Sequence, residues 1–345
     1  MQVGLLTLVD TYEDGLAVGE RYQQVCDLAC LAEELGFDTF WVGEHHFSRY
    51  AVPNPVPLLT AIALRTSRIR LGTGIALAAH HDPIRLAEDY AMLDQASDGR
   101  LDLVIARGAF LQGYAGFNQS VESGRDRIAE ALEIVRGAWT EAPFSYQGRY
   151  RTVDAVTVQP RPVQQPHPPI WLGAGSPESV QITAAQRCHL ALPSVFSPPL
   201  AFKATVEAFR TAAGDSGSDL SVSAGRHTYV AESTEQAEAE WEPHFERYSR
   251  FVQGEFEGPW YEGSDMPERV RGWADGSYHD RVRKFTLCGS PADVARRTIE
   301  MCDGLGGIEH FWGYFDIGDM PTDALVRSVE LYARGVLPLL RDRYG

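Results

Sequence analysis

The sequence has few basic residues and few cysteines for its length. Only 31 Lys and Arg stand against 47 Asp and Glu in 345 residues, so the net charge is −16. A surface of this sign repels phosphate backbones and anionic lipids, so we expect neither nucleic acid nor a membrane as a partner. The five cysteines form no C-x-x-C pair and no zinc-ligand spacing, which favours free thiols in the cytoplasm over a disulfide framework.

Long apolar runs and several catalytic motifs are also missing. No apolar stretch reaches the ~18 residues that a membrane helix needs. The first residues, MQVGLLTLVDTYEDG, lack the basic start and the small-residue cleavage pattern of a signal peptide. A P-loop, a G-x-S-x-G elbow and kinase motifs are absent as well. We therefore expect a cytoplasmic protein whose chemistry uses none of these motifs.

Short apolar runs alternate with helix-like stretches along the chain. Strands are expected at 3–9, 37–43, 69–77, 101–108, 169–175, 189–195, 221–231 and 307–315, each followed by a helix. Short apolar strands are typical of a parallel sheet that is covered on both faces. Eight such units predict an α/β fold, a single (β/α)8 TIM barrel over residues 1–345. An open doubly wound sheet is the structural alternative.

Two insertions interrupt this alternation. Residues 144–160 alternate in polarity around Gly148, which predicts a β-hairpin followed by a linker. Residues 254–268 have no period, and the whole segment 254–283 is expected to be a long mobile loop near the barrel mouth. Such a loop would act as a lid that excludes water.

The residues that follow each strand are the first candidates for chemistry, because barrel enzymes place their sites at the carboxyl ends of the strands. Glu44, His45 and His46 follow the second strand, and His80-His81-Asp82 lie beyond the third. Adjacent strand residues point to opposite faces, and the H-E-x-x-H spacing is absent, so we expect no metal here. One histidine is expected to serve catalysis or ligand binding. The alternative is packing, with one ring in the mouth and the other between helices.

An anion site is expected after the fourth and fifth strands. Gly175, Ser176 and Ser179 open a helix, whose backbone N–H groups, hydroxyls and dipole suit an anion. Glu178 occupies the position of the third glycine of a dinucleotide fingerprint, so that motif is incomplete. Arg107 follows the fourth strand, where a guanidinium can hold a phosphate. Simple helix capping by Ser176 and an ion pair of Arg107 are the alternatives.

Several stretches resemble the bacterial luciferase-like family of flavin-dependent monooxygenases. They are WVGEHHF (41–47), LGTGIAL (71–77), DPIRLAEDYAMLDQASDGRLDLVIARG (82–108), PIWLGAGSPES (169–179) and VELYARGVLPLLR (329–341). The resemblance spans nearly the whole chain. Its Glu-His-His-Phe and Ala-Arg-Gly pieces are typical of the monooxygenase branch, whereas the glycine-rich pieces are shared with deazaflavin-dependent reductases.

The resemblance implies a role for individual residues. His45 matches the catalytic histidine beside the flavin, and its neighbour Glu44 is the second catalytic candidate. The residues implied to bind the cofactor are Gly74 and Ile75, joined by a cis peptide behind the flavin ring, Ala106, Arg107, Arg125, Gly175, Ser176 and Ser179. Ala106 stands where bacterial luciferase has a cysteine. His46 and Glu88 are implied to face a partner subunit, and hence a homodimer.

The function that follows from the resemblance is that of a two-component monooxygenase. A separate flavin reductase would supply reduced FMN, because the chain lacks a complete dinucleotide fingerprint. Dioxygen would add to the flavin to give a 4a-hydroperoxide that oxygenates a small organic substrate. His45 would serve as general acid or base. Two alternatives stay open: a deazaflavin-dependent oxidoreductase that transfers hydride, and a non-catalytic flavin-binding member of the family.

Overall fold

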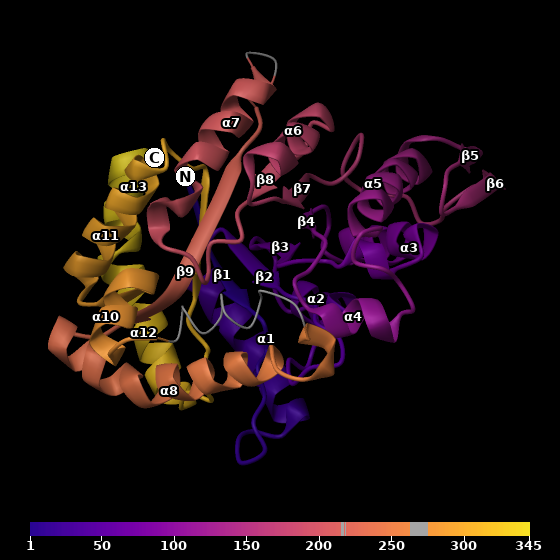
Figure 1. Cartoon of the computed structure of the whole chain (residues 1–345). Helices are drawn as coiled ribbons and strands as arrows, with labels where there is room; N and C mark the ends of the chain where they lie inside the picture. Colours follow the sequence, from indigo (N-terminus) through magenta and orange to yellow (C-terminus); the bar gives the residue numbers. More distant parts are fainter. Residues whose placement is uncertain (215–216, 218, 263–274) are drawn as a thin grey trace.

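Eight parallel strands close into a barrel at the centre of the molecule (Figure 1). The computed structural model describes residues 1–214, 217, 219–262 and 275–345. Around the barrel the order is β9-β11-β1-β2-β3-β4-β7-β8, and a β8–β9 pairing closes the ring. The strands are β1 (Gln2–Thr7), β2 (Thr39–Val42), β3 (Arg70–Thr73), β4 (Leu101–Ile105), β7 (Ile170–Gly173), β8 (His189–Ala191), β9 (Val222–Val230) and β11 (His310–Tyr314). The predicted (β/α)8 fold is confirmed.

Helices surround the barrel (Figure 1). They are α1 (Val18–Glu34), α2 (Pro55–Ala63), α3 (Pro83–Ala96), α4 (Leu111–Gly116), α5 (Gly124–Thr140), α6 (Pro177–Ala185), α7 (Lys203–Ala213), α8 (Thr234–Glu255), α10 (Tyr278–Phe285), α11 (Pro291–Gly304), α12 (Thr322–Gly335) and α13 (Leu337–Tyr344). Short 3-10 turns are η1 (Ala78–His80), η2 (Pro199–Phe202) and η4 (Pro259–Tyr261). Among the described residues, none of these helices combines the length and the apolar character needed to cross a membrane.

Side-chain caps define where many helices begin. Asp82 accepts hydrogen bonds from the backbone N–H groups of Ile84 and Arg85, and Pro83 occupies the first turn of α3. Ser290 caps α11 in the same way, by accepting from the N–H of Asp293. Such caps stabilise a helix start by about 1 kcal/mol. They fix the turns that follow the strands, and the candidate site is built from these turns.

The interior of the barrel is packed rather than hollow. His310 on β11 exchanges hydrogen bonds with Thr39 (2.7 Å) and Ser223 (2.9 Å) across the lumen. The Trp41 indole fills the space beside Gly72, where an added Cβ would lie 2.3 Å from the ring. Side chains therefore fill the lower barrel, and only the mouth at the carboxyl ends of the strands is left for a site.

The predicted hairpin is present, with β5 (Phe144–Gln147) antiparallel to β6 (Thr152–Val156). A ninth parallel strand, β10 (Thr286–Gly289), pairs with the C-terminal half of β9 and was not predicted. The short helix α4 was also not predicted. Both elements are brief, at four and six residues, so neither repeats its period often enough to be recognised in the sequence.

The prediction of a continuous loop over 254–283 is wrong at both ends. Helix α8 runs to Glu255, because Phe245, Tyr248, Phe251 and Val252 give it a buried face with helical spacing. At the other end, α10 begins at Tyr278, where the Ser277 side chain accepts a hydrogen bond from the N–H of Asp280. Between them lies the turn η4, and residues 263–274 of the expected loop fall outside the described residues.

Candidate active site

The turns that follow β2, β3 and β4 are joined to one another at the barrel mouth. The N–H of Glu44 donates to the carbonyl of Ile75 at 3.1 Å. One strand further along, the N–H of Ala106 donates to the carbonyl of Ala76, also at 3.1 Å. The peptide bond between Gly74 and Ile75 is cis, as the resemblance implies. The mouth therefore brings the candidates Glu44, Gly74, Ile75 and Ala106 together on adjoining turns.

His45 lies against one wall of this mouth. Its ring stacks on Tyr50, with the ring centres 4.3 Å apart, and the Phe110 ring is 5.0 Å away. The backbone N–H of His45 donates to the carbonyl of Val52 at 2.9 Å. In the part of the chain that the structure describes, the buried Nδ1 of His45 has no hydrogen-bond partner. Burial lowers the pKa of His45 to about 3, so the imidazole is neutral near pH 7 and can bond to a ligand.

A tyrosine-rich wall continues the mouth beyond His45, and the sequence analysis missed most of it. The hydroxyls of Tyr50 and Tyr248 lie 3.1 Å apart, which ties the turn after β2 to α8. Tyr314 at the end of β11 donates to Asp10 at 3.3 Å, and its ring centre is 5.2 Å from that of His227. These side chains come from five separate segments, so no local spacing in the sequence connects them.

The buried histidines make the protein sensitive to acid. Burial lowers the pKa values of His45, His227 and His310 to about 3, whereas a histidine in the unfolded chain titrates at about 6.5. Below that pH the unfolded chain binds protons that the folded chain does not. We therefore expect the free energy of unfolding to fall, as pH drops below about 6.5, by about 1.4 kcal/mol per pH unit for each ring.

Urea unfolding at several pH values between neutrality and moderate acidity measures this dependence. A free energy of unfolding that stays constant as the pH falls from about 7 to about 5 would contradict it.

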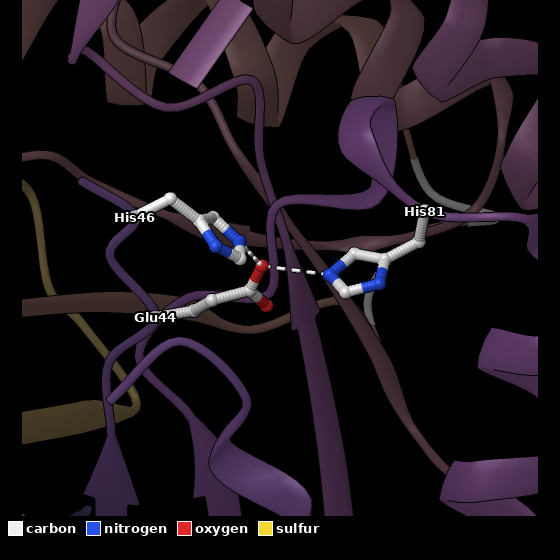
Figure 2. Close-up of side chains that lie close together, drawn as sticks. All are labelled: Glu44, His46 and His81. Atoms are coloured by element: carbon white, nitrogen blue, oxygen red, sulfur yellow. Dashed lines mark hydrogen bonds and ion pairs between the residues drawn. The ribbon is translucent and has the colours of Figure 1, made fainter. Parts of the chain in front are cut away.

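The Glu44 carboxylate lies between two other histidines, His46 and His81 (Figure 2). The Nε2 atoms of His46 and His81 both lie 2.7 Å from the same carboxylate oxygen, Oε1. The other oxygen, Oε2, accepts the N–H of Leu77 at 3.2 Å. Burial raises the pKa of Glu44, but the bonds from His46 and His81 outweigh this effect and lower the pKa to about 2. Glu44 is therefore ionised, and both of its oxygens are occupied.

Glu44, His46 and His81 come together in the structure, which bears on the prediction that no metal binds here. As predicted, His45 turns away from its neighbours, but His81 comes in from the turn after β3, and the ligand atoms of the three lie within 4.8 Å of one another. Histidines that bind metals almost always donate through their second nitrogen. Within the described ranges neither His46 nor His81 bonds to protein through Nδ1. The three side chains form a hydrogen-bonded clamp around the Glu44 carboxylate, and the same three groups lie close enough together to hold a metal ion.

The candidate anion site lies where β4 and β7 lead into α5 and α6. Ser176 and Ser179 cap α6 reciprocally: the Ser176 hydroxyl accepts the N–H of Ser179 at 3.2 Å, and the Ser179 hydroxyl accepts the N–H of Ser176 at 3.1 Å. The capping alternative is therefore realised in the protein itself. Near the ends of the two helices, Arg136 of α5 donates to the carbonyl of Gln186 at 3.0 Å. At their starts, the pKa of Glu178 is lowered by hydrogen bonds at its own helix start and also by the charge of Arg125, so the N-termini of α5 and α6 lie near each other.

Two arginines frame these helix starts. The stem of Arg107 packs against Gly124 at the start of α5, where an added Cβ would lie 3.0 Å from the Arg107 Cγ. Arg125 occupies the next position in the same helix. Among the described residues neither guanidinium has a hydrogen bond or an ion pair, so the expected alternative of an ion-paired Arg107 is absent. Two unpaired guanidinium groups beside two helix N-termini are well suited to a phosphate.

Small residues allow the turns at this edge of the barrel to pack closely against one another. An added Cβ on Gly173 would lie 2.5 Å from the Cβ of Ala106, and one on Gly175 would lie 2.9 Å from Pro193. Close contact between the turns after β4, β7 and β8 therefore requires glycine at both positions. The candidate residues Ala106 and Gly175 thus shape the edge, while the arginines and hydroxyls supply its polar groups.

The two residues that the resemblance implies to face a partner subunit, His46 and Glu88, differ in how exposed they are. The His46 side chain is only 10% exposed, because it turns inward to Glu44 and packs edge-on against Phe117 at 4.8 Å. Glu88 is partly exposed and forms an ion pair with Arg85 on the same helix. Phe47, next to His46, is 62% exposed. The outward-facing groups here are therefore Phe47 and Glu88, and His46 lies inside its own chain.

Comparison with known proteins gives matches along most of the chain. A sequence model of the family described as luciferase-like monooxygenase matches residues 1–307. The oxygenase component of a flavin-dependent trigonelline monooxygenase from Acinetobacter baylyi is 30% identical over 244 residues, which are 69% of this chain and 67% of that protein. The crystal structure of the monooxygenase RslO1 from Streptomyces bottropensis has a TM-score of 0.84 at 28% identity, covering 98% of this chain and 99% of that one.

Two further structures share the fold at lower identity. One is the oxygenating constituent of 3,6-diketocamphane monooxygenase from Pseudomonas putida, in complex with FMN, with a TM-score of 0.83 at 20% identity and 98% of each chain covered. The other is an F420-dependent secondary alcohol dehydrogenase, with a TM-score of 0.76 at 20% identity and 99% of each chain covered. The same barrel is thus found with two related cofactors.

Proposed function

Because the chain belongs to the luciferase-like monooxygenase family and is an oxidoreductase of that family, we propose that it is the oxygenase component of a two-component monooxygenase. In this proposal the chain binds reduced FMN, which a separate flavin reductase supplies, and uses dioxygen to oxygenate a small organic substrate. The observation that supports it most is a mouth that holds both a candidate anion site and the Nδ1 of His45, which has no hydrogen-bond partner among the described residues.

The described residues fit a flavin that carries a phosphate. The guanidinium groups of Arg107 and Arg125, the hydroxyls of Ser176 and Ser179 and the start of α6 would hold the phosphate. The Gly74–Ile75 stretch would lie against the ring. Once bound, the reduced flavin supplies the reaction with dioxygen, and the protein supplies orientation and exclusion of water.

His45 would act at the reacting end of the bound flavin. Its ring is held by Tyr50 and Phe110, and its neutral imidazole can accept a proton from the substrate or donate a hydrogen bond. Because these two rings hold the His45 ring in one orientation, it is well placed to act on a substrate that enters the mouth. We assign His45 as the catalytic residue of the proposed reaction.

The choice of FMN over F420 is part of the proposal. It is supported by the relative from Acinetobacter baylyi, which is named as a flavin-dependent oxygenase component. The F420-dependent glucose-6-phosphate dehydrogenase from Kineococcus radiotolerans is also 30% identical, but over only 49% of this chain. Titration of the protein with FMN and with F420, followed by quenching of tryptophan fluorescence, compares the two directly. Tighter binding of F420 would favour the hydride-transfer alternative.

A test of turnover supplies the protein with a flavin reductase, NAD(P)H, dioxygen and a panel of small organic substrates. We expect an oxygenated product that depends on both the reductase and this protein. A product formed under exclusion of dioxygen, with F420 as the reductant, would instead support the deazaflavin alternative. Binding of flavin without any product across a broad panel would favour the non-catalytic alternative.

A homodimer is the assembly that we propose. The exposed Phe47 ring lies 5.3 Å from the ring of Phe117, which is also exposed, and the two form an apolar surface. Apolar groups gathered at one place on a surface often mark an interface. Sedimentation equilibrium gives the mass in solution, and a monomer at all concentrations would contradict this assembly.

A further inference from the structure

The Glu44 carboxylate holds the segment that follows β3 at two points. Its Oε2 accepts the N–H of Leu77 near the start of this segment, and its Oε1 accepts Nε2 of His81 at the end. The backbone of Glu44 adds a third point, because its N–H donates to the carbonyl of Ile75. Residues 75–81 are thus fastened to the turn after β2 through a single residue.

The second histidine completes the environment of this carboxylate. Glu44 is only 2% exposed, so its charge has little contact with water. A buried carboxylate is costly unless hydrogen bonds satisfy it. His46 donates to the same Oε1 at 2.7 Å from the opposite side (Figure 2). Glu44 therefore accepts three hydrogen bonds, two from imidazoles and one from the backbone.

This arrangement leaves Glu44 poorly suited to transfer a proton to a substrate. Both of its oxygens face protein donors, and His45, which lines the mouth, is directed elsewhere. A proton-transfer group must instead come within hydrogen-bond reach of the reacting atoms. The geometry therefore argues against a catalytic role for Glu44, which its position next to His45 in the sequence first indicated.

We propose that Glu44 is a positioning residue, and that His46 and His81 hold its carboxylate so that the Gly74–Leu77 stretch keeps the shape that receives the flavin ring. The inference rests on the proposed function, in which this stretch contacts the cofactor. His81 is the key residue, because it joins the far end of the segment to Glu44. The sequence separates these two residues by 37 positions.

The experiment compares His81→Leu with His81→Gln. Leucine removes the donor, whereas the glutamine amide can still donate to Oε1 of Glu44. We expect His81→Leu to raise the dissociation constant of FMN by about tenfold, equivalent to about 1.4 kcal/mol, and His81→Gln to recover most of that loss. Riboflavin should be affected as strongly as FMN, because the segment contacts the ring and not the phosphate. His80→Leu is the matched control, since His80 bonds to Gln119 and not to Glu44.

The outcomes distinguish this inference from the proposed function. If the unaltered protein bound no flavin, the proposed function would fail, whatever the variants did. If the unaltered protein bound FMN and His81→Leu bound it equally well, the positioning role would be overturned. The same holds if folded His81→Gln lost as much affinity as His81→Leu, or if His80→Leu lost as much. If His81→Leu does not fold, Glu44→Gln is used in its place, and we expect it to bind both FMN and riboflavin more weakly than the unaltered protein does.

A metal at the same residues would also overturn the positioning role. Elemental analysis of the purified protein, and FMN titration before and after treatment with a chelator, test for it. We expect no stoichiometric divalent metal and an unchanged dissociation constant for FMN.

Discussion

His45→Ala is expected to lower product formation by about 10²–10⁴-fold, the range for loss of a general acid or base, while dioxygen consumption continues and releases hydrogen peroxide. The reason is the position of the ring, which stacks on Tyr50 with its buried Nδ1 unpartnered among the described residues. The variant should fold and bind FMN normally, since the phosphate contacts lie elsewhere. Product, dioxygen and hydrogen peroxide are measured in parallel, with a substrate identified by screening.

His80→Ala serves as the control for this prediction, because His80 is a neighbouring, partly buried histidine that bonds to Gln119. Its ratio of product to dioxygen should match that of the unaltered protein. Full coupled turnover by His45→Ala would show that His45 is not the catalytic residue.

Arg107→Ala is expected to weaken FMN binding by about 10–100-fold, because hydrogen bonds to charged groups contribute about 1.5–3 kcal/mol. Riboflavin, which has no phosphate, should lose much less affinity. The guanidinium of Arg107 has no protein partner among the described residues and lies beside the start of α5. Equilibrium titration with the two flavins measures the difference.

Ser176→Ala is the milder companion of this variant. One neutral hydrogen bond contributes about 1 kcal/mol, so the loss for FMN should be about fivefold, part of it due to the missing cap of α6. Equal losses for FMN and riboflavin in Arg107→Ala would mean that this arginine does not bind the phosphate.

Most of the barrel could be predicted because its strands are apolar and its helices periodic. The strands β4 and β11, for example, are buried at all five positions and consist mainly of apolar residues. The strand β10 could not be predicted, because four residues, Thr-Leu-Cys-Gly, carry too little pattern to separate a strand from a turn. The loop was predicted to begin at residue 254, whereas α8 ends at Glu255. Gly254 and Glu255 interrupt the apolar spacing of the helix in its last turn, so the sequence indicated an end that comes too early.

The candidate site could be predicted where its residues follow one another, and not where they meet across the fold. Ser176 and Ser179 share one helix start, so their spacing already indicates an anion site or a cap. Glu44 follows the end of β2 by two residues and His81 follows the end of β3 by eight, so only the path of the segment after β3 brings them to 2.7 Å. The divergence of His45 and His46 followed from the alternation of an extended chain, whereas the inward turn of His46 depends on His81 and Phe117.

The central claim is that this barrel mouth receives reduced FMN and governs its reaction with dioxygen. The most direct test mixes anaerobic reduced FMN, with and without the protein, with dioxygenated buffer and follows the return of the oxidised-flavin absorbance. Exclusion of water at the mouth predicts a reoxidation that is clearly slower with the protein than without it, and a delay that disappears in Arg107→Ala at the same FMN concentration. Identical time courses with and without the protein, at concentrations where FMN is bound, would contradict the claim.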